Sequence, residues 1–134
     1  VCVMIVVQFF FLVRRRPPRS TLFPCATLFR SVYDEPRDVA KAIPGLKLVE
    51  MGSRCRERGF CCGAGGGHMW IEESQGERVN HVRTDQFLET DADMVGVSCP
   101  FCVQMMTEGI QAKGLDSEKQ AKDVIELLAD SLDL

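Results

Sequence analysis

The segment that most restricts how this chain can fold is GFCCGAGGGHMW, residues 59–70. Five of its twelve residues are glycine, and glycine disfavours the interior of both helices and strands. We therefore expect an irregular backbone here. Two adjacent cysteines, Cys61 and Cys62, begin it. On a regular element, neighbouring side chains would point apart, whereas an irregular glycine-rich backbone allows both sulfurs to turn toward one centre.

A second cysteine motif, Cys99-Pro-Phe-Cys102, follows after 36 intervening residues. It comes directly after a short apolar run and before a segment with helical character, so it predicts a strand–CxxC–helix junction. At such a junction both sulfurs can face one point, and the N–H groups at the start of the helix favour the thiolate form. The four cysteines of the two motifs are therefore the candidate ligands of one site: Cys61, Cys62, Cys99 and Cys102.

Four kinds of site compete for these motifs. A phosphate loop is disfavoured because GAGGGH fails G-x-G-x-x-G at its last position and no G-K-[ST] follows. A thioredoxin-like dithiol would need most of the sheet after its CxxC and would leave the adjacent pair unexplained. A Cys₄ zinc site stays open, although structural zinc usually takes two spaced pairs. An iron–sulfur cluster accounts for the pair, the glycines and the CxxC together, because glycines leave room for it and backbone N–H groups bind its sulfurs.

The charge is distributed unevenly. Residues 1–31 hold five of the 16 basic residues and no acid, so the rest of the chain carries 11 basic against 19 acidic residues. An acidic domain argues against a nucleic-acid partner, because phosphate binding needs the opposite sign. The seven cysteines, without a secretory pattern, indicate reduced thiols used as ligands or redox groups.

The first 31 residues differ in character from the rest. Their apolar run of thirteen residues is too short to span a bilayer, which needs about 20, and its arginines follow the run rather than precede it as in a secretory signal. The string from Phe9 to Ser31 resembles translated sequencing-adaptor DNA. We therefore expect residues 1–31 to be a non-native or disordered extension outside the fold, and residues 32–134 to form the domain.

The remaining sequence alternates between helical and strand patterns. Helices are expected over 33–43, 76–90, 100–113 and 117–132, and strands over 46–51 and 93–99. Ser117 and Gln120 fit a capping box for the last helix, and Val79, Val82, Phe87 and Leu88 mark the apolar face of the second. This order predicts an α/β fold with a small parallel sheet flanked by helices.

Four segments of the chain resemble one known family. YDEPR, AIPGL, RERGFCCGAGGG and SCPFC resemble the CCG cysteine-rich domain of iron–sulfur redox subunits, over residues 33–132. These include a subunit of heterodisulfide reductase and the iron–sulfur subunits of glycolate oxidase, anaerobic glycerol-3-phosphate dehydrogenase and lactate-utilization systems. The resemblance implies a cluster-binding domain that passes electrons from a flavoprotein dehydrogenase, or between other electron-transfer subunits, to a quinone or another carrier. In the heterodisulfide reductase branch it implies disulfide cleavage instead.

The resemblance also implies a cofactor and its contacts. The cofactor is a [4Fe–4S] cluster, cubane or non-cubane, held by Cys61, Cys62, Cys99 and Cys102, with Gly63 and Gly65 beside it. The family pattern has a further cysteine upstream of the pair. Cys25, separated from Cys61 by 35 residues, mimics that spacing from within the adaptor-like string.

What the resemblance implies about the whole protein is that this chain is the C-terminal part of a longer subunit of an oxidoreductase. It is expected in the cytoplasm, or peripheral on the inner face of the membrane within a complex, without a membrane span of its own. Near the site, we expect Cys55 to be a bystander and His68 to be a weaker candidate for contact with the cluster. Met69, Trp70 and Ile71 are expected to shield it from water.

Overall fold

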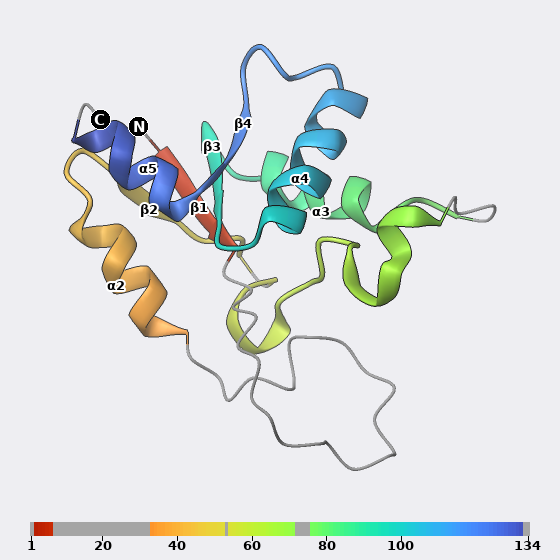
Figure 1. The fold of residues 1–134 in the computed structure, drawn as a ribbon, viewed down its shortest axis with the longest axis horizontal. Coiled ribbons are helices and arrows are strands. Elements are labelled where there is room, and N and C mark those ends of the chain that lie inside the picture. Colours follow the sequence, from red (N-terminus) through yellow and green to blue (C-terminus); the bar gives the residue numbers. More distant parts are fainter. Residues whose placement is uncertain (1, 7–32, 53, 72–75, 133–134) are drawn as a thin grey trace.

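The computed structural model describes residues 2–6, 33–52, 54–71 and 76–132. Its centre is a four-stranded sheet in the order β2-β1-β3-β4, in which every pair is parallel (Figure 1). The strands are β1 (Cys2–Val6), β2 (Lys47–Val49), β3 (Met94–Val97) and β4 (Gln120–Asp123). The α-helices are α2 (Asp34–Ala42), α3 (Val79–Leu88), α4 (Pro100–Ala112) and α5 (Val124–Ser131), with short 3₁₀ helices η1 (Arg56–Arg58) and η2 (Gly65–Trp70). The predicted α/β class with a small parallel sheet is confirmed.

The order of the strands creates a natural binding position. The chain passes from β1 to β2 on one side and then returns across β1 to β3 and β4 on the other. The strand order therefore reverses between β1 and β3. In open α/β sheets, ligands bind beyond the carboxyl ends of the strands at such a reversal. The CxxC motif begins two residues after the end of β3 and so lies at this position.

The structure differs from the expectation for residues 1–31 at Cys2–Val6, which form β1 between β2 and β3. The apolar run at the N-terminus reads as a membrane or signal segment, but strands of parallel sheets, covered on both faces, are also continuous apolar runs. The adaptor-like string from Phe9 to Ser31 lies outside the described residues, and so does Cys25.

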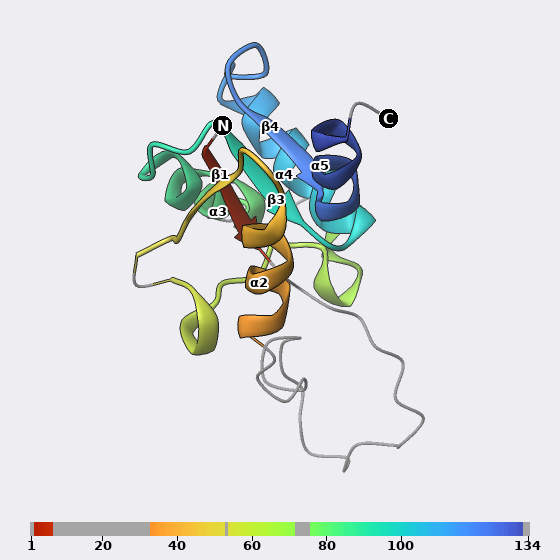
Figure 2. The same cartoon turned by 90° about the vertical axis from the view of Figure 1, so that its left-hand side faces the viewer.

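Helices cover the sheet on two sides (Figures 1 and 2). On one side, α2 and α5 contribute a small aliphatic cluster of Ala40, Ile43, Val124 and Leu127. On the other, α3 and α4 pack with β3 around a larger buried cluster that includes Phe87, Val95, Val97, Met105, Met106 and Ile110. Parallel strands need such cover on both faces because their side chains alternate between them. No helix in the described part of the chain is long and apolar enough to cross a bilayer.

The C-terminal segment differs from its sequence pattern. Residues 117–132 were expected to form one helix, but Gln120–Asp123 pair with β3 as an edge strand and the helix begins only at Val124. Asp123 caps α5 by accepting a hydrogen bond from the Ile125 amide, and Glu126 accepts one from the Asp123 amide in return. The capping box therefore lies six residues later than the predicted one at Ser117.

Candidate metal centre

The CxxC motif is positioned by the junction of β3 and α4. Cys99 is the N-cap residue of α4 with an extended backbone, and Pro100 occupies the first helical position. Proline suits this position because it has no N–H to leave unsatisfied and its φ is already helical. Cys102 then falls in the first turn. Cys99 is 8% exposed and Cys102 is 2% exposed, so both thiols face the interior at the positive end of a helix dipole, where a thiolate is stabilised.

The adjacent cysteines come to the same place from the glycine-rich segment. The Sγ atom of Cys62 lies 3.2 Å from the Sγ atom of Cys102, 40 residues away in the chain. Cys62 is 2% exposed. Cys62, Cys99 and Cys102 belong to the same buried cluster, and the half-buried Cys61 packs against it. The structure thus brings all four predicted cysteines to one end of the core.

The glycines after the pair have a specific structural task. The backbone N–H of Gly63 donates to the Sγ of Cys61 at 3.4 Å, and the Gly65 amide also hydrogen-bonds this thiol. Gly63 has φ +97°, and a Cβ there would lie 3.2 Å from Asn80 N, Met105 Cε and Val79 Cβ. A larger residue would therefore be both strained and crowded. Gly63 and Gly65, predicted beside the cofactor, direct their amides to a candidate ligand sulfur.

The electrostatics of the metal-free thiols follow from this packing. Hydrogen bonding to Cys62, together with burial, raises the pKa of Cys61 above its ordinary value. Hydrogen bonding to Cys102, with burial, raises the pKa of Cys62 to about 11. At neutral pH the two thiols are therefore protonated in the metal-free protein. Metals bind the deprotonated form, so metal binding here releases protons.

Two buried polar side chains on α3 were not singled out by sequence reasoning. The buried face of α3 consists of Asn80, Arg83, Thr84 and Phe87. The side chain of Arg83 is buried among these, and its positive charge interacts with the thiols of Cys62, Cys55, Cys61 and Cys102. Burial lowers the pKa of this guanidinium to about 10. The signal in the sequence is the i, i+3, i+4, i+7 spacing of these four residues, which the valines beside them obscured.

These residues fit an iron–sulfur cluster by the chemistry of their donors. The site offers four thiols at a helix N-terminus, backbone N–H groups on sulfur and a buried cation that offsets negative charge. Within the described ranges, no three His, Cys, Asp or Glu side chains are close enough to hold a single metal ion. A cluster makes a different demand, because its thiolates bind separate iron atoms.

The remaining sequence candidates lie at the edge of the site or away from it. Cys55 is half-buried, and its Sγ lies 3.3 Å from the carbonyl oxygen of Gly52. His68 is exposed. Met69 packs against the buried cluster, but Trp70 is 78% exposed and Ile71 is also exposed. The expected shielding from water by these three residues therefore applies to Met69 alone.

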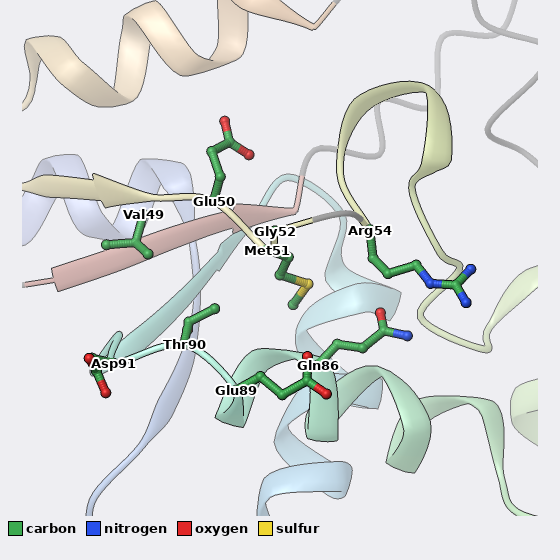
Figure 3. A pocket seen from close by; sticks show the side chains of 9 residues that line it. All are labelled: Val49, Glu50, Met51, Gly52, Arg54, Gln86, Glu89, Thr90 and Asp91. Carbon is green, nitrogen blue, oxygen red and sulfur yellow. The ribbon is translucent and has the colours of Figure 1, made fainter.

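A shallow pocket of about 400 Å³ lies beyond the end of β2 and has no cysteine in its lining (Figure 3). Its charged residues, Glu50, Glu89, Asp91 and Arg54, include one that is already paired, since Glu50 forms an ion pair with the buried Arg37 of α2. This pocket carries no recognisable chemistry of its own. It adjoins the candidate centre only through Arg54 and Gln86, which both accept hydrogen bonds from Arg83.

Comparison with known proteins gives a consistent result. A family model described as a cysteine-rich domain, CCG, matches residues 21–107. A protein named probable iron-sulfur-binding oxidoreductase FadF, from Bacillus subtilis (strain 168), is 48% identical over 104 residues, which are 78% of this chain and 15% of the relative. EtfAB:quinone oxidoreductase of Syntrophomonas wolfei subsp. wolfei is 42% identical over 104 residues, covering 72% of this chain and 14% of the relative.

A third relative comes from an archaeon. It is one of the subunits of the dihydromethanophenazine:CoB–CoM heterodisulfide reductase of Methanosarcina barkeri, and it is 40% identical over 103 residues, which are 77% of this chain and 24% of the relative. The chain thus spans less than a quarter of the length of each of these three relatives. No solved structure matches it.

Proposed function

Because the chain belongs to the family of CCG cysteine-rich domains, we propose that it binds an iron–sulfur cluster and carries electrons within an oxidoreductase complex. The observation that carries this proposal is the contact of 3.2 Å between the sulfurs of Cys62 and Cys102. It joins the two cysteine motifs in a buried position at the strand-order reversal, where α/β sheets bind their ligands. When bound, the cluster supplies one-electron redox chemistry.

The chain's own residues would prepare the site in three ways. Cys61, Cys62, Cys99 and Cys102 are the proposed ligands. The amides of Gly63 and Gly65 already hydrogen-bond the Cys61 sulfur, and such bonds to ligand sulfurs help to set the reduction potential. The residues around the thiols, among them Met105 and Met106, exclude water from the inner side of the site. Burial of this kind is a further determinant of potential.

The type of cluster and the partners follow from the family. We propose a [4Fe–4S] cluster, cubane or non-cubane, with a flavoprotein dehydrogenase or another electron-transfer subunit as donor and a quinone or another carrier as acceptor. The relative named EtfAB:quinone oxidoreductase supports this direction of transfer. We place the domain, residues 32–134 with β1, in the cytoplasm or on the inner face of a membrane as part of a complex.

A second function is favoured by the relative whose name includes CoB–CoM heterodisulfide reductase. In that case a non-cubane cluster at the same cysteines would cleave a disulfide substrate. The two functions use one site and differ in the electronic structure of the cluster. The comparison between them is therefore spectroscopic.

Anaerobic reconstitution of the 134-residue chain with iron and sulfide tests the proposal. We expect visible absorbance from the cluster, iron and sulfide in equal amounts, and an EPR signal after reduction with dithionite. A signal of an ordinary cubane supports electron transfer, and an unusual one supports disulfide cleavage. Protein that binds zinc in a Cys₄ site and acquires no chromophore would refute both redox functions. In parallel, Cys25→Ser shows whether Cys25 is a ligand, since loss of iron in this variant would add it to the set.

A further inference from the structure

A single buried guanidinium lies beside the candidate ligands. Arg83 is 3% exposed, on the face of α3 that packs against α4 and the glycine-rich segment. Arginine is almost never buried to this extent unless its charge is compensated. The described carboxylates that form ion pairs use other cations, such as Arg37, Arg56, Arg78 and three lysines. The groups that interact favourably with the charge of Arg83 are thiols: Cys62, Cys55, Cys61 and Cys102.

The hydrogen bonds of Arg83 leave one donor unused. Its Nη1 donates to the carbonyl oxygen of Arg54 at 3.1 Å and to Oε1 of Gln86 at 2.7 Å. Both partners are uncharged oxygens. Its Nε is buried and has no hydrogen-bond partner among the described residues. A buried donor without a partner costs about 1–3 kcal/mol, and together with an uncompensated charge it marks a side chain arranged for a group that is not a protein residue.

The position of Arg83 is fixed rather than adaptable. Its Nη1 is bound on one side by the loop after β2 and on the other by Gln86, one turn further along α3. One turn before it, Asn80 donates to the Met105 carbonyl oxygen at 3.2 Å and thereby joins α3 to α4 just beyond the first turn that holds Cys102. A charge held this rigidly beside a redox group acts without having to reorganise when the electron arrives.

From these contacts we propose that Arg83 sets the reduction potential of the cluster, by placing a fixed positive charge beside it and donating its Nε–H to a cluster or ligand sulfur. This inference rests on the proposed function. On reduction the cluster takes up one electron from its donor and gains one negative charge, with no bond broken in the protein. A nearby positive charge stabilises the reduced state more than the oxidised state. Arg83 is thus a tuning residue, whereas the cysteines are the ligands.

The test is an EPR-monitored redox titration of the reconstituted chain. Arg83→Met removes the charge and keeps most of the volume, and we expect the ratio of reduced to oxidised cluster at a fixed ambient potential to fall about tenfold or more, which is a shift of about 59 mV for one electron. Arg83→Lys keeps the charge and is expected to keep most of the wild-type ratio. Arg78→Met is the matched control, since Arg78 adjoins α3 but pairs with Glu108, and it should leave the ratio unchanged.

A second measurement does not depend on the folding of a variant. In wild-type protein labelled with ¹⁵N-arginine, pulsed EPR of the reduced cluster should detect a coupled ¹⁵N nucleus, and the coupling should disappear in Arg83→Lys. A cluster with the wild-type potential in Arg83→Met, or wild-type protein without the ¹⁵N coupling, would overturn the inference while leaving the proposed function intact. Wild-type chain that forms no cluster at all would overturn both.

Discussion

The two faces of the sheet are built from different materials. The face covered by α2 and α5 is aliphatic, with Ala40, Ile43, Val124 and Leu127 at its centre. The face covered by α3 and α4 contains sulfur and polar groups as well as apolar ones: three buried cysteines, three methionines, and the buried Asn80, Arg83 and Thr84. We call these the aliphatic face and the thiol face.

The faces also differ in how well they are satisfied. The two buried side-chain polar atoms found without a hydrogen-bond partner in the described residues are Oδ1 of Asn80 and Nε of Arg83, both on the thiol face. Two thiols there have raised pKa values. Native proteins leave few buried polar groups unpaired, and the exceptions concentrate at functional sites. The aliphatic face therefore stabilises the fold, and the thiol face is arranged for a ligand.

The largest effect that separates the faces is expected from the cysteines. Cys62→Ser removes a proposed ligand and keeps a side chain of similar size, so we expect iron content after reconstitution to fall close to zero and the visible absorbance to be lost. Cys55→Ser is the matched control, because Cys55 lies in the loop after β2 and is half-buried. Full iron content in Cys62→Ser would remove this residue from the ligand set. Loss of iron in Cys55→Ser would make the fifth thiol a ligand.

The thiol face could be anticipated from the sequence to the extent that its signals are local. The adjacent pair, the CxxC after an apolar run and the proline at the start of the next helix each depend on a few neighbouring residues, and all are found where they were expected. Their convergence required only that the glycine-rich segment fold back onto α4, which the shared chemistry of the two motifs indicated.

Long-range pairing explains what could not be anticipated. The N-terminal apolar run becomes β1 only because β2 and β3 flank it, and Gln120–Asp123, which have a helical pattern, become a strand only because the edge of β3 is available. Arg83 was missed for a similar reason. The apolar period of residues 76–90 favours Val79 and Val82 as the buried face, but the approach of α4 at Gly109 buries Asn80, Arg83 and Thr84 instead.

On the aliphatic face the expected effect is on stability alone. Leu127 is 4% exposed, and Leu127→Ala should lower the free energy of unfolding by about 2–5 kcal/mol through lost burial and a cavity. The neighbouring Ile125 is 69% exposed, so Ile125→Ala should stay within about 0.5 kcal/mol of wild type. Urea denaturation measures both. Iron content per folded molecule should be unchanged in Leu127→Ala, and a loss of iron there would show that the two faces are not independent.

The contact between α3 and α4 gives the next largest effect. A Cβ at Gly109 would lie 2.1 Å from Oγ1 of Thr84 and 3.1 Å from the Asn80 carbonyl oxygen. Gly109→Ala should therefore push α3 away from α4 and cost about 1–3 kcal/mol, despite the better helix propensity of alanine. We also expect weaker iron retention against a chelator, since this contact holds Arg83 near Cys102.

Gly45→Ala is the matched control for this substitution. Gly45 has φ +76° and no atom within 4 Å of an added Cβ, so alanine there costs about 1–2 kcal/mol of backbone strain without a clash. Both variants should be less stable in urea, but only Gly109→Ala should release iron faster. Equal iron retention in the two variants would separate the spacing of α3 and α4 from the properties of the site.

The smallest effect concerns the pH dependence of the metal-free protein. The pKa of Cys62 is raised from 9.0 to about 11 by its hydrogen bond to Cys102 and by burial. The folded state thus holds this proton more tightly than the unfolded chain does. The resulting stability is fully present below pH 9 and is lost as the pH rises through about 11, with a slope of at most about 1.4 kcal/mol per pH unit for one thiol.

Urea denaturation of the metal-free chain between about pH 8 and pH 11 measures this slope. Cys62→Ala should flatten it, because the titrating thiol is gone, whereas Leu127→Ala should lower stability by the same amount at every pH. A slope that survives in Cys62→Ala would assign the titration to another group. Bound cluster should reverse the dependence, since binding needs thiolates and releases their protons. Assembly would then improve over the same pH range in which the metal-free thiol face becomes less stable.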